Sequence, residues 1–179
     1  MDTLNLLDAQ DGFSSFSKLV VKLLTAGKSV GTAESCTGGM ISALFTSVPG
    51  SSNWFKGGIV AYCNAIKENL LGVPGDVLSR HGAVSEETAR AMAAGVRTLL
   101  GVECAIAVTG IAGPSGGTPE KAVGTVCFAW DVEGDIRSAT CKFDGPRQDV
   151  RASSVNMAIQ GLLQCLDGNP PHLPAPGNR

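Results

Sequence analysis

The sequence predicts an α/β protein with three layers, in which helices cover both faces of a mixed, mostly parallel sheet. Short apolar segments alternate with amphipathic ones over the first two thirds of the chain, as in βαβ units. Residues 104–110, CAIAVTG, are mainly apolar, which is typical of a strand buried on both faces. Two strand-like segments flank the turn DVEG near the C-terminus and predict an antiparallel hairpin.

The first half of the chain contains helices and strands in alternation. A helix is expected over residues 5–26, because Phe13, Phe16, Val20 and Leu23 recur at spacings of three and four. The next expected elements are a strand over 29–33, a helix from 40, a loop over 48–58, a buried strand over 58–63 and a helix over 64–72.

A helix over 85–100 has the clearest boundary signals. Ser85 suits the N-cap, Glu86 and Glu87 suit the first turn, and Gly101 suits the end. Its expected apolar stripe comprises Ala89, Met92, Ala93, Val96, Leu99 and Leu100.

The last helix is expected from about Pro146 to Leu166, with Gly168 as its stop. Its apolar side comprises Val155, Ile159, Leu162, Leu163 and Leu166. We therefore expect one domain over residues 1–167, followed by a flexible tail over 168–179.

Composition limits the classes of partner. The formal net charge of −2 and the pI near 5.6 argue against non-specific nucleic-acid binding, which needs a basic face. No run of about 18 apolar residues occurs, so no membrane span is expected. The first residues, MDTLNLLDAQDGF, lack the layout of a signal peptide, and a cytoplasmic location is expected.

The six cysteines predict neither a disulfide framework nor a metal site. They lie at wide, irregular intervals without a CxxC pair, and the only histidines are His81 and His172. Several lie in or beside apolar runs, where a cysteine usually acts as a small buried hydrophobe.

Polar residues follow three expected strands. The segments are 32–39 (TAESCTGG), 58–67 and 106–118, and ligands of open α/β sheets bind at the carboxyl ends of strands. If these ends are neighbours, one cleft would contain Ser35, Thr37, Tyr62, Asn64, Lys67 and Thr109.

Ser35 is a candidate nucleophile, and Lys67 is its natural base in a chain with no plausible catalytic histidine. Lysine acts as a base only where burial lowers its pKa toward neutrality. Tyr62 would relay a proton or hold Lys67 in place. A helix starting near Thr37 would supply free N–H groups for an oxyanion or a phosphate. Spacing alone favours the simpler interpretation, in which Ser35 and Thr37 are N-caps and Lys67 is a surface lysine, and the catalytic interpretation stays open beside it.

Two arginines near the start of the last helix suggest an anion. Arg147 and Arg151 lie one turn apart, where a cation is unfavourable by about 0.3–1 kcal/mol. A bound phosphate would reverse that sign, and Asp149 would be an alternative neutralising group. The glycine-rich segment 110–118 fits an anion-binding nest or an ordinary loop.

Roughly residues 30–130 resemble the CinA C-terminal domain family, whose active members are nicotinamide-nucleotide amidohydrolases. The matching stretches are TAESCTGGMIS, VPGSSNWFKGGIVAYCNAIK, HGAVSEETARAMA and VTGIAGPSGGTPEKAVGTV. The resemblance implies hydrolysis of the carboxamide of nicotinamide mononucleotide (NMN), which gives nicotinate mononucleotide and ammonia. It also implies no metal and no cofactor.

Carried onto this chain, the resemblance makes Ser35 the nucleophile, Lys67 the base and Tyr62 the accessory hydroxyl. Glu34 would balance the cationic pyridinium ring, and Arg147 or Arg151 would bind the 5′-phosphate. The full set of implied substrate-binding residues is Glu34, Thr37, Gly38, Asn64, Thr109, Gly110, Arg147 and Arg151.

The segment YCNAIK departs from the family pattern, because Cys63 replaces a serine and Ala65–Ile66 replace glutamate–alanine. Two alternatives therefore stay open: a catalytically silent nucleotide-binding protein, or an amidase of another pyridine nucleotide. A homodimer is also expected, with residues 53–55 (NWF) as a contact surface if they are exposed.

Overall fold

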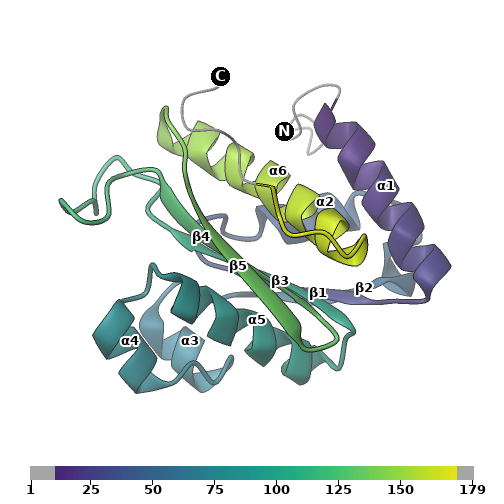
Figure 1. Cartoon of the computed structure of the whole chain (residues 1–179), viewed down its shortest axis with the longest axis horizontal. Helices are drawn as coiled ribbons and strands as arrows, with labels where there is room; N and C mark the ends of the chain where they lie inside the picture. The colour runs from purple at the N-terminus through teal and green to yellow at the C-terminus, as the bar shows by residue number, and fades with distance from the viewer. Residues whose placement is uncertain (1–10, 173–179) are drawn as a thin grey trace.

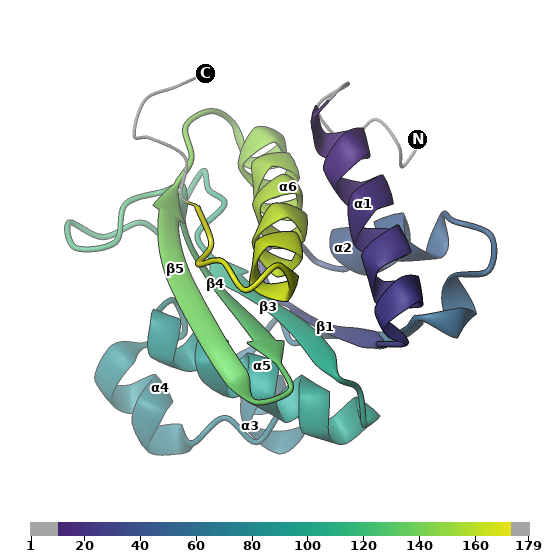
Figure 2. The ribbon, with the colours of Figure 1, turned by 45° about the vertical axis from the view of Figure 1, so that its right-hand side comes forward.

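A five-stranded mixed sheet separates two layers of helices in the computed structural model, which describes residues 11–172 (Figure 1). Helices α1, α2 and α6 cover one face, and α3, α4 and α5 cover the other (Figure 2). The three-layer prediction is confirmed. In chain order the elements are α1 (Asp11–Ala26), β1 (Val30–Glu34), α2 (Met40–Thr46), β2 (Phe55–Val60), α3 (Asn64–Asn69), α4 (Gly75–His81), α5 (Glu86–Leu100), β3 (Cys104–Gly110), β4 (Thr125–Val132), β5 (Asp135–Lys142) and α6 (Arg147–Leu166).

The sheet has the strand order β2-β1-β3-β4-β5. Strand β1 pairs in parallel with β2 and β3, and its register sets Thr32 opposite Gly58 and Ile106. Strands β4 and β5 form the predicted hairpin and join the sheet antiparallel to their neighbours. The parallel strands β2, β1 and β3 therefore end side by side.

The boundary signals of α5 are confirmed. The Ser85 hydroxyl accepts the Thr88 N–H at 3.2 Å, and Gly101 takes the left-handed conformation with φ 60°. The apolar stripe is buried as far as Val96. Leu99 was expected in that stripe, but its side chain is 51% exposed. Leu100, in the same turn of α5, packs against the core, and successive helix residues point about 100° apart, so Leu99 lies off the buried face.

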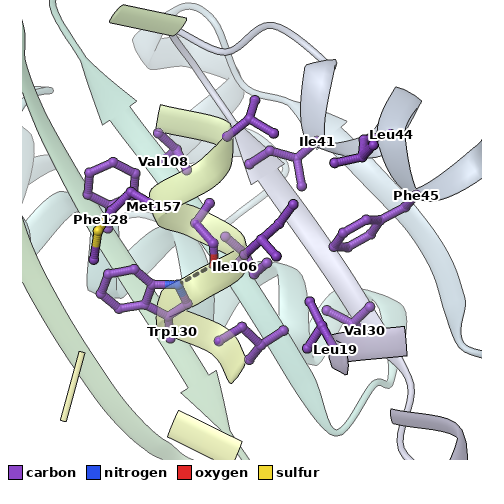
Figure 3. Packing of buried hydrophobic residues seen from close by; sticks show 14 of the residues in the cluster. Leu19, Val30, Ile41, Leu44, Phe45, Ile106, Val108, Phe128, Trp130 and Met157 are labelled. Carbon is purple, nitrogen blue, oxygen red and sulfur yellow. Dashed lines mark hydrogen bonds between the residues drawn. The ribbon is translucent and has the colours of Figure 1, made fainter. Parts of the chain in front are cut away.

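The core between the sheet and the layer of α1, α2 and α6 contains the chain's two tryptophans. Figure 3 shows Trp130 in this core beside Phe128. Trp130 stacks with Phe128 at a ring-centroid distance of 5.6 Å, because residues two apart on β4 share one face of the sheet. Its indole N–H donates to the Ala158 carbonyl at 2.8 Å. Fully burying large side chains of this kind contributes about 1.5–3 kcal/mol each.

The strand expected over 58–63 is displaced. Strand β2 begins three residues earlier, ends at Val60 and alternates between covered and exposed positions, because it lies at an edge of the sheet. Trp54 and Phe55 belong to the core and only Asn53 of this segment is exposed, so residues 53–55 do not offer the expected contact surface. The homodimer stays a prediction without that surface.

Helix α4, Gly75–His81, follows Pro74 and is an element that the sequence analysis missed. The start of the helix expected from residue 5 and most of the tail lie outside the described residues. Within residues 11–172, no helix has the length and apolar character that crossing a bilayer requires. The same residues contain no group of three or more His, Cys, Asp or Glu side chains that could hold a metal ion.

Candidate active site

The carboxyl ends of β1, β2 and β3 meet at one edge of the sheet. The Ser35 N–H donates to the Val108 carbonyl at 2.9 Å, and the Ala61 N–H donates to the Glu34 carbonyl at 2.8 Å. These two bonds extend the parallel pairing past the ends of the strands. The prediction that the three polar segments are neighbours is confirmed.

Ser35 and Lys67 lie within hydrogen-bonding distance. The Lys67 Nζ atom is 3.3 Å from the Ser35 Oγ atom, and both side chains are buried. The ammonium also donates to the carbonyls of Ala61, at 2.7 Å, and Tyr62, at 3.4 Å. The main chain that leaves β2 therefore fixes the position of the lysine.

Burial lowers the pKa of Lys67, because a charged ammonium loses its hydration there. Only 1% of the Lys67 side chain is exposed. In the part of the chain that the structure describes, no carboxylate lies within ion-pair distance of its Nζ atom. A buried lysine without a counter-ion favours the neutral form, which is the form that acts as a base.

Cys36, the residue after Ser35, does not compete as a nucleophile. Burial raises the pKa of the Cys36 thiol to about 12. The reactive form of cysteine is the thiolate, which is scarce near neutral pH at such a pKa. Ser35 is therefore the candidate nucleophile of this turn.

Glu34 caps helix α2. Its carboxylate accepts the N–H groups of Gly39 at 2.9 Å, Ile41 at 3.1 Å and Ser42 at 2.8 Å, and the Ser42 hydroxyl at 2.7 Å. A carboxylate is favourable at a helix N-terminus. The sequence analysis missed this capping role of Glu34 and the contribution of Ser42. An acidic residue shortly before a helix is the signal that could have indicated it.

This arrangement corrects two expectations. Glu34 is 1% exposed and its oxygens are engaged, so it does not contact a substrate ring. The helix begins at Met40 rather than near Thr37, and its first N–H groups bind Glu34 instead of an oxyanion or a phosphate. The Gly38 N–H is also engaged, because it donates to the Ser35 carbonyl at 3.1 Å.

Tyr62 lies at the edge of the site with its side chain 62% exposed. Its hydroxyl accepts from the Arg147 guanidinium at 3.3 Å, and Arg147 also donates to the Gly113 carbonyl at 2.9 Å. The carbonyl of Tyr62 contacts Lys67, whereas its hydroxyl faces Arg147. Tyr62 thus holds the lysine through its main chain, and the expected proton relay through its hydroxyl is not supported.

Arg151 reaches the turn after Ser35 from helix α6. Its Nε donates to the Cys36 carbonyl at 3.1 Å and its terminal nitrogen donates to the Thr37 carbonyl at 2.7 Å. Among the described residues, Asp149 pairs with neither Arg147 nor Arg151. Asp149 therefore forms no direct ion pair with either arginine, although it lies in the first turn of the same helix.

The other predicted site residues differ in their surroundings. The Thr109 hydroxyl donates to the Ala83 carbonyl at 2.7 Å, and Gly110 ends β3 beside it. Asn64 is exposed at the first position of α3. The Thr37 hydroxyl oxygen is buried and has no hydrogen-bond partner within residues 11–172.

Comparison with known proteins identifies the family of the chain. Residues 14–166 match the CinA C-terminal domain. The CinA-like protein of Mycobacterium tuberculosis H37Ra is 48% identical over 163 residues, covering 90% of this chain, and that of Gemmatimonas aurantiaca is 50% identical over 134 residues, covering 75%. The chain spans 37% and 31% of the length of these two relatives.

Solved structures show the same fold. A competence-damaged protein (CinA) superfamily protein from Klebsiella pneumoniae 700603 is 34% identical, with a TM-score of 0.85 over 89% of this chain and 99% of that one. The competence/damage inducible protein CihA from Agrobacterium tumefaciens is 37% identical, with a TM-score of 0.83 over 88% and 96%. The chain belongs to the CinA C-terminal domain family.

Proposed function

We propose that this protein hydrolyses the carboxamide of NMN to nicotinate mononucleotide and ammonia, with Ser35 as nucleophile and Lys67 as base. The observation that carries the proposal is the 3.3 Å approach of the buried Lys67 Nζ atom to the Ser35 Oγ atom. A serine hydroxyl attacks well only when a base removes its proton, and a lysine beside it serves that purpose once it is neutral.

In the proposed mechanism, neutral Lys67 takes the Ser35 proton while Oγ bonds to the carboxamide carbon. The resulting ammonium returns that proton to the amide nitrogen, the C–N bond breaks and ammonia leaves. The ester on Ser35 is then attacked by water, whose proton passes to Lys67 and back to Oγ. Each turnover consumes one water and restores both side chains.

Donors for the oxyanion are limited by the turn itself. The N–H groups of Gly38 and Gly39 are used within the chain, and those of Cys36 and Thr37 contact the buried Cys36 thiol, so none of these four is free for the proposed oxyanion in this arrangement. Arg147 is exposed at the edge of the site and is the proposed ligand of the 5′-phosphate. The ring would lie between this arginine and Ser35.

The test compares wild type with Ser35→Ala on NMN. Ammonia release and nicotinate mononucleotide are followed by an enzymatic assay and by chromatography. We expect product from the wild type and at least a 1,000-fold lower rate from the variant, which is the order by which loss of a catalytic nucleophile lowers turnover. Equal turnover by both proteins would refute the assignment of Ser35.

A binding measurement separates the alternatives. Calorimetry with NMN on Ser35→Ala shows whether the substrate binds when turnover is blocked. NMN binding without turnover in the wild type would indicate a nucleotide-binding protein that the substitutions in YCNAIK have silenced. Neither binding nor turnover, together with hydrolysis of a different pyridine nucleotide amide, would indicate another amidase.

A further inference from the structure

An arginine on helix α6 donates two hydrogen bonds to the turn that carries Ser35. Arg151 lies on α6, in the layer across the sheet from the helix that carries Lys67 (Figure 2). Its two donors, Nε and a terminal nitrogen, bind the two consecutive carbonyls that follow Ser35, at 3.1 Å and 2.7 Å. We infer that Arg151 is a positioning residue, which holds the Ser35 turn in place for catalysis and does not bind the substrate phosphate. This inference rests on the proposed function.

The first argument concerns the hydrogen bonds that the Arg151 guanidinium already makes. Arginine binds phosphate best when two parallel N–H groups of its planar fork face the anion. Arg151 has committed Nε and a terminal nitrogen, which form one such edge, to main-chain carbonyls. Arg147 makes one main-chain contact and one contact to the exposed Tyr62 hydroxyl, and it lies at the outer edge of the site.

The second argument is electrostatic. A cation near the start of a helix is unfavourable, because the N-terminal N–H groups carry partial positive charge. Two charge-assisted hydrogen bonds together stabilise more than this effect destabilises, so no bound anion is needed to explain a cation at position 151. The hydrogen bonds of Arg151 to the Ser35 turn thus explain why a cation lies near the start of α6, which had suggested a bound phosphate.

The third argument is the fit between the turn and the arginine. Gly38 takes the left-handed conformation with φ 61°, and a Cβ atom there would lie 3.4 Å from the terminal nitrogen of Arg151. Glu34 holds the other end of the turn through the N-terminus of α2. The carboxylate of Glu34 and the guanidinium of Arg151 therefore hold the segment from Ser35 to Gly38 from two sides. These contacts restrict movement of the Ser35 Oγ atom.

The experiment compares Arg151→Met with Arg147→Met on two substrates, NMN and nicotinamide riboside, which lacks the phosphate. We expect Arg151→Met to lower kcat by about 30- to 100-fold on both substrates, because a displacement near 1 Å costs about 100-fold. Its Kd for NMN should stay within about threefold of wild type. Arg147→Met should raise KM for NMN more than KM for the riboside.

A second readout does not depend on NMN. A fluorophosphonate that labels activated serines is added, and the rate of Ser35 modification is followed by mass spectrometry, with Ser35→Ala as the blank. Arg151→Met should be labelled about 30- to 100-fold more slowly than wild type. Arg80→Met is the control, because Arg80 is exposed on α4 and pairs with Asp76, and it should be labelled at the wild-type rate. Arg151→Lys keeps the charge without the fork and should recover less than a tenth of the lost rate.

The outcomes are distinct. A defect of Arg151→Met that disappears with the riboside would identify a phosphate ligand and overturn the inference, as would labelling at the wild-type rate. Slow labelling in a protein that never turns over NMN would support the inference and refute the proposed substrate. Circular dichroism checks folding, and if Arg151→Met unfolds, Arg151→Lys and Arg151→Gln provide the same comparison.

Discussion

The Nζ atom of Lys67 lies 3.3 Å from the Oγ atom of Ser35, although 32 residues separate them in the chain. Strand β2 pairs with β1, so the chain that leaves β2 passes the end of β1 and carries α3 over the turn after Glu34. Lys67 enters from α3 and has no carboxylate partner among the described residues. The sheet order thus creates both the contact and the burial that lowers the pKa of the lysine.

Replacing Lys67 by arginine tests the requirement for a neutral base. Lys67→Arg keeps a positive charge, but a guanidinium is not deprotonated in proteins. We expect kcat for NMN hydrolysis to fall by about 10²- to 10⁴-fold, the range for loss of a general base. Ammonia release measures the change. More than a tenth of wild-type activity in the variant would contradict the assigned role.

The pH dependence of kcat/KM reports the pKa of Lys67 in the free enzyme. Activity should rise with pH through that pKa, and its midpoint should lie below the ordinary lysine value of 10.5 because burial lowers it. Ala65 is exposed on α3, and Ala65→Glu adds a carboxylate that favours the ammonium. The midpoint should therefore move to higher pH in the variant. A shift to lower pH would refute this explanation.

Stability should depend on pH through the same group. Between the lowered folded-state pKa of Lys67 and 10.5 the unfolded chain binds more protons, so the free energy of unfolding rises with pH in that window. Lys67→Met lacks this dependence. Its stability relative to wild type should be highest at low pH and decline by about 1.4 kcal/mol per unit of pKa lowering. Urea denaturation at pH 7 and pH 10 measures the difference, and equal differences would contradict the prediction.

The buried Thr37 hydroxyl is expected to reduce stability. It has no partner in the described part of the chain, and an unsatisfied buried polar group costs about 1–3 kcal/mol. Thr37→Val should therefore raise the free energy of unfolding by about 1 kcal/mol. Thr32→Val is the matched control, because the Thr32 hydroxyl pairs with Ser42 at 2.8 Å and its loss should destabilise. The same sign for both variants in urea melts would refute the prediction.

Gly95 supports the site from a distance. A Cβ atom on Gly95 would clash with the backbone carbonyl of Leu71, and the N–H of Val73 donates to the Lys67 carbonyl at 3.0 Å. Alanine is the better helix former by about 1 kcal/mol, but overpacking against backbone costs about 1–3 kcal/mol and should prevail.

We therefore expect Gly95→Ala to lower both the melting temperature and kcat, measured by calorimetry and ammonia release. Thr98→Ala, one turn on and exposed, is the control and should change neither. A more stable, fully active Gly95→Ala would show that the Leu71 segment yields without moving Lys67.

Local signals were sufficient for elements whose boundaries depend on neighbouring residues. Ser85 and Gly101 delimit α5 as predicted, because an N-cap and a left-handed C-cap act within one turn of the helix. The apolar run over 104–110 predicted the central strand, since only a strand covered on both faces lacks a polar side. The candidates Ser35 and Lys67 also came from the sequence.

Tertiary structure decided what those residues face. Whether Lys67 is a surface lysine or a buried base depends on the position of α3 against the end of β1, which no local pattern contains. Glu34 turned inward to cap α2, Arg151 reached the Ser35 turn, and β2 became an edge strand, all because of sheet order and helix packing. The sequence determined the elements and the chemical groups, and long-range packing determined which groups meet, because contacts between distant segments depend on the whole fold.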